Sequence, residues 1–390
     1  MKFNPFRIVF LGFIFCLLAL TIYSYTQIDL NLTLSANPIY QYIQKQLILL
    51  GYFQRHQSAF IYSLIQIILF GLYFYVIKQV LNNRLNLHQI IKLISLVSLL
   101  AVLSYPAFSH DIFNYMFDAR IVTKYHLNPY FYKANDFPSD LWVRFMHWTH
   151  RYYPYGPIWL ILTLPFSYLG FGKFILTLIN FKLMFLLFHL GNLYLIYKIV
   201  QKIDPDHKLA SLAFYGLNPL IISESLISPH NEVMMLFFAL GALYWGILQN
   251  SKFKYILLMI ISAGVKFISL AFLPLILLKK YIKGKPAGVE HLLKLILTLT
   301  TLFICLEIYY REAYPWYFII FIGFSSLLIK YKKLFVFSCI LSLGALGRYV
   351  PFLYEGVYSD SLQRMENLIF YLPIAIYLFY NLIFLRRVKL

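Results

Sequence analysis

The stretch S-H-D-I-F-N-Y, which begins at residue 109, places a histidine and a carboxylate directly after an apolar run. Asp111, Tyr115 and Asp118 follow one another at intervals of four and three residues, so they share one face if the segment is helical. Because the dielectric constant falls at the end of a membrane helix, a carboxylate there can have the tuned pKa of a base that acts on an amphiphilic substrate. Alternatively, Asp111 and Asp118 are interfacial helix residues whose charges are balanced by His110 and Arg120.

Aromatic side chains crowd two motifs that follow, N-P-Y at 128–130 and Y-Y-P-Y-G-P-I-W at 152–159. Pro157 suits the first turn of a helix that re-enters the membrane, because its missing N–H group has no partner to lose there. Aromatic rings at this depth form either an interfacial belt or stacking platforms for a sugar ring. The composition alone leaves both interpretations open.

Three further groups carry polar chemistry. The turn S-P-H-N-E at 228–232 lies between two apolar runs and offers hydrogen-bond donors and acceptors suited to hydroxyl groups. The motif A-Y-P-W-Y-F at 313–318 opens another apolar run. Arg348 follows a run and is a permanent cation that could bind a phosphate.

The composition determines which elements can hold these residues. Of 390 residues, 61% are apolar and 13% are charged, and the mean hydropathy is +0.70. These values exclude a soluble globular protein and predict a polytopic membrane protein. The net charge of +19 comes from 34 basic and 15 acidic residues.

Most of the basic residues lie in the terminal tails or in short linkers between apolar runs, which predicts that these parts face the cytoplasm. Nearly all carboxylates then lie on the opposite side, and the charge implies no nucleic-acid partner. Cys16, Cys305 and Cys339 all fall within apolar runs and lack the spacing of metal ligands, so we expect neither a disulfide nor a metal site.

Apolar runs long enough to cross a membrane occur at 8–28, 58–80, 89–108, 174–200, 209–227, 232–249, 291–308 and 367–385. Shorter or broken runs lie at 157–171, 255–278, 315–329 and 334–346. We therefore predict an all-α membrane bundle with about 10–12 membrane segments. The first run is expected to be an uncleaved helix, and the whole chain, 1–390, is expected to form one integral membrane domain.

The run 255–278 carries Lys266 near its centre. A chain that turns around near Lys266 would return its basic end to the cytoplasm and would mark a site, whereas a single tilted helix would let Lys266 reach the surface with its long side chain. Outer loops are expected at 29–57, with an interfacial helix-like stretch, and at 109–156 and 347–366. The last two are expected to form the active site.

The order of these motifs resembles that of the polyprenol-phosphate-mannose-dependent mannosyltransferases of the GT-C superfamily. The resemblance rests on D-x₃-Y from Asp111, N-P-Y, Y-G-P-x-W from Tyr155, H-N-E, the intramembrane Lys266 and P-W-Y, over roughly 105–350. The chain has Glu232 where H-N-D is expected, which bears on the sugar or acceptor more than on the class of enzyme.

The resemblance implies a membrane hexosyltransferase that moves a sugar, mannose in the first instance, from a polyprenyl-phosphate donor to a glycan or glycolipid acceptor. Asp111 would act as the base in an inverting reaction, while Lys266 and Arg348 would stabilise the departing phosphate. Glu307 is an alternative, purely structural partner for Lys266. No cofactor is expected, although a divalent cation is compatible with the pattern. The expected location is a bacterial cytoplasmic membrane, with the active site facing outward.

The residues expected to bind substrate are His110, Tyr115, Asp118, Asn128, Tyr130, Tyr155, His230, Asn231, Glu232, Lys266, Trp316, Tyr317 and Arg348. A transporter or flippase is the rival interpretation, because an intramembrane lysine and broken helices also mark transport sites. Against it, neither half of the chain repeats the other, and the polar residues gather toward one side.

Overall fold

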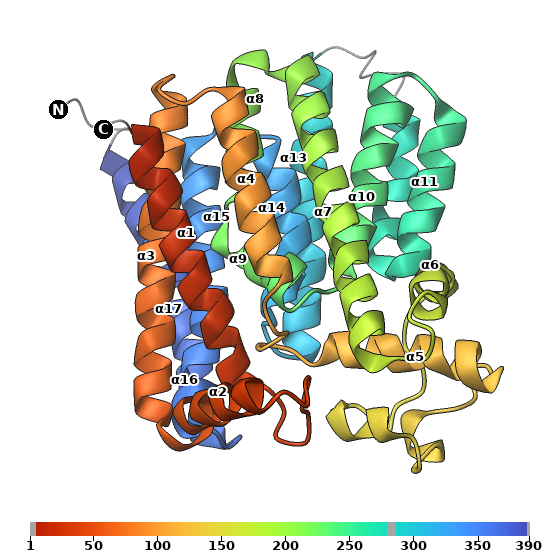
Figure 1. Cartoon of the computed structure of the whole chain (residues 1–390). Helices are drawn as coiled ribbons and strands as arrows, with labels where there is room; N and C mark the ends of the chain where they lie inside the picture. The colour runs from red at the N-terminus through yellow and green to blue at the C-terminus, as the bar shows by residue number, and fades with distance from the viewer. Residues whose placement is uncertain (1–4, 279–285, 388–390) are drawn as a thin grey trace.

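The computed structural model describes residues 5–278 and 286–387, and over these residues the chain is helical and contains no β-strand. Most of the helices run alongside one another in a bundle (Figure 1). The all-α membrane bundle predicted from the sequence is therefore confirmed.

The elements of the first half are α1 (Pro5–Ser24), η1 (Tyr25–Gln27), α2 (Pro38–Ile48), η2 (Leu49–Phe53), α3 (Arg55–Leu81), α4 (Leu87–Val102), α5 (Asp111–Tyr125), η3 (Ala134–Asp136), η4 (Leu141–Phe145), α6 (Pro157–Tyr168) and α7 (Phe174–Ile203). Those of the second half are η5 (Pro205–His207), α8 (Lys208–Gly216), α9 (Pro219–Ile222), η6 (Ser223–Ile227), α10 (Glu232–Gly241), η7 (Ala242–Leu248), α11 (Lys252–Val265), η8 (Phe267–Leu278), α13 (Pro286–Tyr310), η9 (Pro315–Tyr317), α14 (Phe318–Ser326), α15 (Lys332–Gly347), α16 (Tyr349–Glu355) and α17 (Asp360–Arg387).

Six helices are long and apolar enough to cross a membrane, within the part of the chain that the structure describes. The pair Pro205–Gly216 and Pro219–Ile227, which is bent by 50°, is apolar enough to form either a seventh, broken span or a re-entrant loop. The bend has a local cause, because the Asn218 side chain accepts a hydrogen bond from Leu220 N and starts a new helix with Pro219 in its first turn. The runs 89–108 and 232–249, which were predicted to cross the membrane, form the shorter helices Leu87–Val102 and Glu232–Leu248. The described residues thus hold six or seven helices of spanning length, fewer than the predicted number of about 10–12 membrane segments.

The run around Lys266 turns back on itself. Helix α11 ends at Val265, Lys266 is extended with φ −150° and ψ 128°, and the chain continues as η8 packed against α11. The turn-around near Lys266 is therefore correct, and the single tilted helix is wrong.

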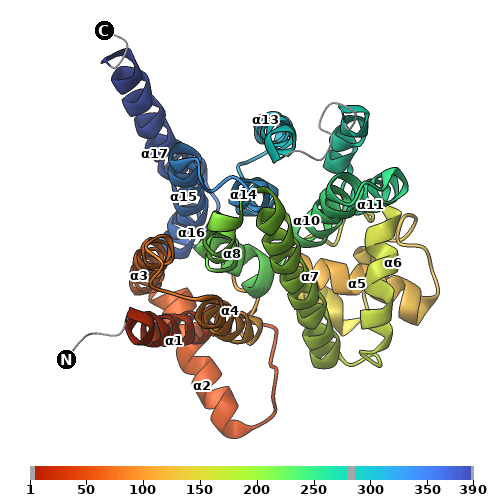
Figure 2. The ribbon, with the colours of Figure 1, turned by 90° about the horizontal axis from the view of Figure 1, so that it is seen from above.

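The two ends of the bundle differ in character. The connections α3–α4 and α7–α8, which carry basic residues, lie at the upper end in Figure 1, whereas α2 and α5 lie at the lower end. Helix α5 lies across the direction of the long helices there, and α17 projects from the periphery of the bundle (Figures 1 and 2). The predicted loop 109–156 thus begins with a transverse helix.

The expected loop 347–366 is wrong over most of its length. Helix α16 continues to Glu355 and α17 begins at Asp360, so the break between them is short. It begins at Gly356, whose φ of +76° favours glycine. The loop was expected from the charged residues Arg348, Glu355, Asp360, Arg364 and Glu366. Arg348 is instead buried and paired with Glu312 and Glu366, so the helical chain continues past it.

A buried lysine ties together the segments that lead to the polar motifs. Lys182, on α7, donates hydrogen bonds to the carbonyl oxygens of Ala101 (3.4 Å), Ser104 (2.5 Å) and Ile227 (3.2 Å). These carbonyls belong to the end of α4, the residues just beyond it and the end of η6, where a cation is favourable. Lys182 therefore fixes the chain shortly before Asp111 and before His230.

Candidate active site

A cavity of about 400 Å³ opens at the lower end of the bundle, between α5, α10, the turn at Lys266 and η9. It is lined by Asp111, Trp148, Arg151, Pro154, Tyr155, Gly156, Glu232, Met235, Val265, Lys266, Phe267, Ile268, Ile304, Glu307, Arg311, Tyr314, Trp316, Tyr317 and Ile320. The structure thus brings together six of the residues predicted from the sequence: Asp111, Tyr155, Glu232, Lys266, Trp316 and Tyr317.

Asp111 is the first residue of α5, and its side chain remains 14% exposed. Its backbone N–H donates to Ser109 Oγ at 3.2 Å, which fixes the start of the helix. Burial raises the pKa of Asp111 to about 6, and the nearby charge of Glu232 acts in the same direction, while Arg151 and Lys266 oppose it. A carboxylate held in this way is suited to accept a proton.

His230 connects Asp111 to a second buried carboxyl group. Its Nε2 lies 3.7 Å from Asp111 Oδ2 and 3.1 Å from Ser109 Oγ, and its Nδ1 lies 3.3 Å from Glu224 Oε2. The other oxygen of Glu224 accepts a hydrogen bond from the Tyr349 hydroxyl at 3.0 Å. Glu224 was not predicted from the sequence, although an acidic residue inside an apolar run is itself a sign of function.

Lys266 forms an ion pair with Glu232 across the cavity wall. Its Nζ also lies 5.1 Å from the centre of the Tyr317 ring, within the range of a cation–π interaction. Glu307, the partner considered from the sequence, instead lies 3.8 Å from Arg311. The residue that departs from the H-N-D pattern is thus the one that contacts the intramembrane lysine.

Aromatic rings form one wall of the cavity. Trp316 stacks between His230, with ring centres 4.2 Å apart, and Tyr314, at 4.6 Å. Tyr155 also lines the cavity, and Tyr115 supports it from behind in an edge contact of 5.4 Å. Because neighbouring rings cover both faces of Trp316, it can present only an edge to the cavity, which Tyr155, Tyr314 and Tyr317 also line.

Several predicted residues lie outside the lining. The Asn128 side chain accepts a hydrogen bond from Tyr130 N, and the Tyr130 hydroxyl donates to Tyr155 O at 2.8 Å, so both shape the loop. Asn231 is buried at the start of α10, and His110 packs against His147. Asp118 is also outside, and burial raises its pKa to about 8.

Arg348 is also outside the lining, and its charge is already neutralised. It is 4% exposed and donates hydrogen bonds to Glu312 (2.9 Å), Glu366 (3.0 Å) and Asn367 (2.8 Å). The cations that do line the cavity besides Lys266 are Arg151 and Arg311, which the sequence analysis did not single out.

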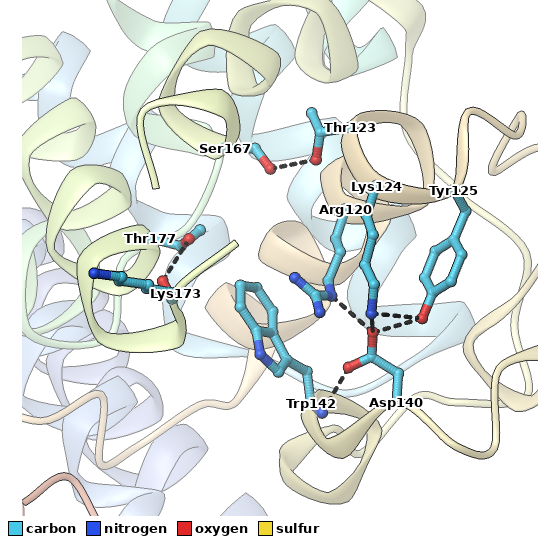
Figure 3. Close-up of polar contacts among 9 residues, drawn as sticks. All are labelled: Arg120, Thr123, Lys124, Tyr125, Asp140, Trp142, Ser167, Lys173 and Thr177. Atoms are coloured by element: carbon cyan, nitrogen blue, oxygen red, sulfur yellow. Dashed lines mark hydrogen bonds and ion pairs between the residues drawn. The ribbon is translucent and has the colours of Figure 1, made fainter. Parts of the chain in front are cut away.

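A network of charged residues holds the loop that carries Trp148 and Arg151 against α5 (Figure 3). Asp140 Oδ2 accepts hydrogen bonds from Arg120 (2.8 Å), Lys124 (2.9 Å) and the Tyr125 hydroxyl (2.6 Å). The Arg120 guanidinium also lies 3.9 Å from the centre of the Trp142 ring. Arg120 is thus a partner of Asp140, not of the Asp111–Asp118 face.

Among the described residues, no cluster of three or more metal-ligating side chains is formed by the cavity lining itself. The fold and the cavity define a multi-pass membrane protein with a carboxylate, aromatic rings and cations gathered at one end. The chain belongs to the family described as alpha-(1->6)-mannopyranosyltransferase, N-terminal domain, which matches residues 17–280.

The protein is therefore a glycosyltransferase that transfers mannose, and this reaction requires no cofactor. The matched region contains the motifs from Asp111 to Lys266 but not P-W-Y or Arg348. No curated protein and no solved structure matches the chain.

Proposed function

We propose that the protein transfers mannose from a polyprenyl-phosphate donor to a glycan or glycolipid acceptor, at the end of the bundle that carries α5. The observation that carries the proposal is the position of Asp111, a partly exposed carboxylate that shares one cavity with Lys266, Arg151 and Arg311. Acceptor activation and phosphate departure require these two kinds of group together.

In the proposed reaction, an Asp111 oxygen accepts the proton of the acceptor hydroxyl while the hydroxyl oxygen attacks the anomeric carbon. The bond between that carbon and the phosphate oxygen breaks, and its electron pair leaves with the phosphate. A single displacement inverts the configuration, so an α-linked mannoside requires a β-linked donor. A phosphate is a good leaving group, so the mechanism needs no general acid.

The cavity residues can be assigned to the two parts of the donor, its phosphate and its sugar. Lys266 and Arg311 lie on the side formed by η8 and α13, and they are our candidates for the phosphate. The rings of Trp316 and Tyr317 would contact the transferred sugar. Arg348 is assigned a structural role, because two carboxylates already pair with it.

We further propose that the chain works as a single domain and that the cavity faces outward. The cavity is lined from both sides of residue 280, by α5 and α10 as well as α13 and η9. The basic linkers gather at the other end, and the positive-inside rule places such linkers in the cytoplasm. The expected setting is the cytoplasmic membrane of a bacterium.

The test uses the purified full chain with a membrane extract as the source of acceptor. Radiolabelled mannose is supplied as β-linked polyprenyl-phosphate mannose, as its α-linked anomer, or as a nucleotide sugar. We expect label to enter the acceptor only from the β-linked lipid donor and to appear in an α linkage. Transfer from the nucleotide sugar in the absence of lipid donor, or an unchanged anomeric configuration, would overturn the proposed donor or mechanism.

A further inference from the structure

Three metal-ligating side chains from separate segments meet just outside the cavity. Asp29 follows η1, His110 precedes α5, and His147 lies in the loop after η4. Their ligand atoms all lie within 4.8 Å of one another, and the two imidazole ring centres are 3.9 Å apart. The proposed transfer reaction uses none of these three side chains.

Hydrogen bonds fix Asp29 beside the segment that leads to His110. Asp29 N donates to the Tyr105 hydroxyl at 3.2 Å, and the Tyr25 hydroxyl donates to Leu103 O at 2.8 Å. One carboxylate oxygen of Asp29 accepts from Asn31 N at 2.8 Å, an outer contact of the kind that orients a ligating carboxylate. The first loop and the chain before α5 thus present their ligands in a fixed relation.

One ring nitrogen in the cluster is buried and unsatisfied. His110 Nε2 has no hydrogen-bond partner among the described residues and no contact with solvent. Buried polar atoms in folded proteins almost always have a partner, and an ion is one of the partners that can account for such an exception. This observation is independent of the distances within the cluster.

We propose that Asp29, His110 and His147 bind a divalent transition-metal ion of the zinc class. Two imidazoles and one carboxylate are ligands that zinc accepts, and with three protein ligands the fourth position is left for water. The ion joins the chain after α1 to the loop that follows α5. His110 and His147 directly precede the cavity residues Asp111 and Trp148, so the ion fixes two points of the cavity wall.

The test measures metal binding and does not depend on the proposed transfer reaction. The full-length protein, with any polyhistidine tag removed, is treated with chelator and titrated with Zn²⁺ by calorimetry and in thermal unfolding. We expect one ion per chain and a higher midpoint of unfolding, because an ion that binds only the folded state stabilises it. Co²⁺ should give the visible absorption of a four-coordinate site.

Asp29→Asn and His147→Ala should each weaken Zn²⁺ binding by about tenfold or more. Replacing a residue that only orients a metal ligand already costs that much affinity, and removing a ligand should cost at least as much. The matched control is His150→Ala, which removes an exposed histidine from the same loop and should bind as the parent does. His147 is exposed, so its replacement is expected to preserve the fold. A parent that binds no stoichiometric ion, or a His147→Ala variant that binds as tightly as the parent, would overturn the proposal.

Discussion

His230 Nε2 lies 3.7 Å from Asp111 Oδ2, although 119 positions separate the two residues in the sequence. On the other side of the imidazole, Glu224 Oε2 lies 3.3 Å from Nδ1, and the ring is stacked on Trp316. The ring therefore lies between the two carboxyl groups, where it can help to position the Asp111 carboxylate. Asp111 would then react with the acceptor, while His230 and Glu224 would only position it.

Replacing Asp111 with Asn keeps the size of the side chain and removes its ability to accept a proton. We expect kcat for mannose transfer to fall by about a hundredfold or more, the scale typical of a lost general base. Asp136→Asn, an exposed change in the same loop, is the control and should transfer mannose normally. Turnover of Asp111→Asn near that of the parent would remove Asp111 from the mechanism.

Glu224→Gln tests the positioning role of the buried carboxyl group. Glu224 lies behind His230 and outside the cavity lining, so its replacement should lower kcat while KM for the donor stays within about twofold. Tyr349→Phe, which removes only the hydroxyl that donates to Glu224, should cause a smaller loss of kcat. If Glu224→Gln instead raised KM for the donor and left kcat unchanged, Glu224 would act on substrate binding.

Replacements of Lys266 and Arg348 should have different effects, although the resemblance implied the same role for both residues. Lys266 lines the cavity, so Lys266→Met should weaken binding of the lipid-phosphate donor by about tenfold or more, as expected for a lost charge-assisted hydrogen bond. Arg348→Gln should leave donor affinity unchanged in the folded fraction and lower the midpoint of thermal unfolding, because it leaves Glu366 buried without its cation. If Arg348→Gln weakened donor binding and Lys266→Met did not, Arg348 would be the residue that binds the donor phosphate.

The contrast between these cations shows what sequence could and could not predict here. The apolar runs and the turn near Lys266 follow from spacing and hydropathy, which are local properties. The grouping of Asp111 with Glu232 and Trp316, which lie far apart in the sequence, was expected only from the resemblance of the ordered motifs to a known family. The partners of Arg348 lie on other helices, at Glu312 and Glu366, and no local pattern connects them. Glu224 was missed because it stands alone in its run.

The orientation of the chain can be tested by labelling single cysteines from outside the cell. Asn83→Cys in the α3–α4 connection and Asp136→Cys in the loop after α5 are both at exposed positions, at opposite ends of the bundle. In a background without Cys16, Cys305 and Cys339, an impermeant thiol reagent should label position 136 and not position 83 until the membrane is opened. The reverse pattern would place the cavity in the cytoplasm.

Asp140→Asn should loosen the loop that carries part of the cavity wall. Burial would raise the pKa of Asp140, but hydrogen bonds from Tyr125, Arg120 and Lys124 outweigh it and hold the pKa well below its usual range. The substitution leaves Arg120, whose side chain is 9% exposed, without its counter-ion, at a cost of about 3–5 kcal/mol. We expect a lower midpoint of thermal unfolding and faster proteolytic cleavage within residues 126–156.

The same network predicts the sign of a pH dependence. Because the pKa of Asp140 is lower in the folded state, its contribution is fully present above the unfolded pKa of about 3.9 and is lost as the pH falls toward the folded value. The difference in stability between the parent and Asp140→Asn should therefore be constant near neutral pH and shrink below about pH 4. A difference that grows on acidification would mean that Asp140 is protonated in the folded protein and that the ion pairs with Arg120 and Lys124 are not formed.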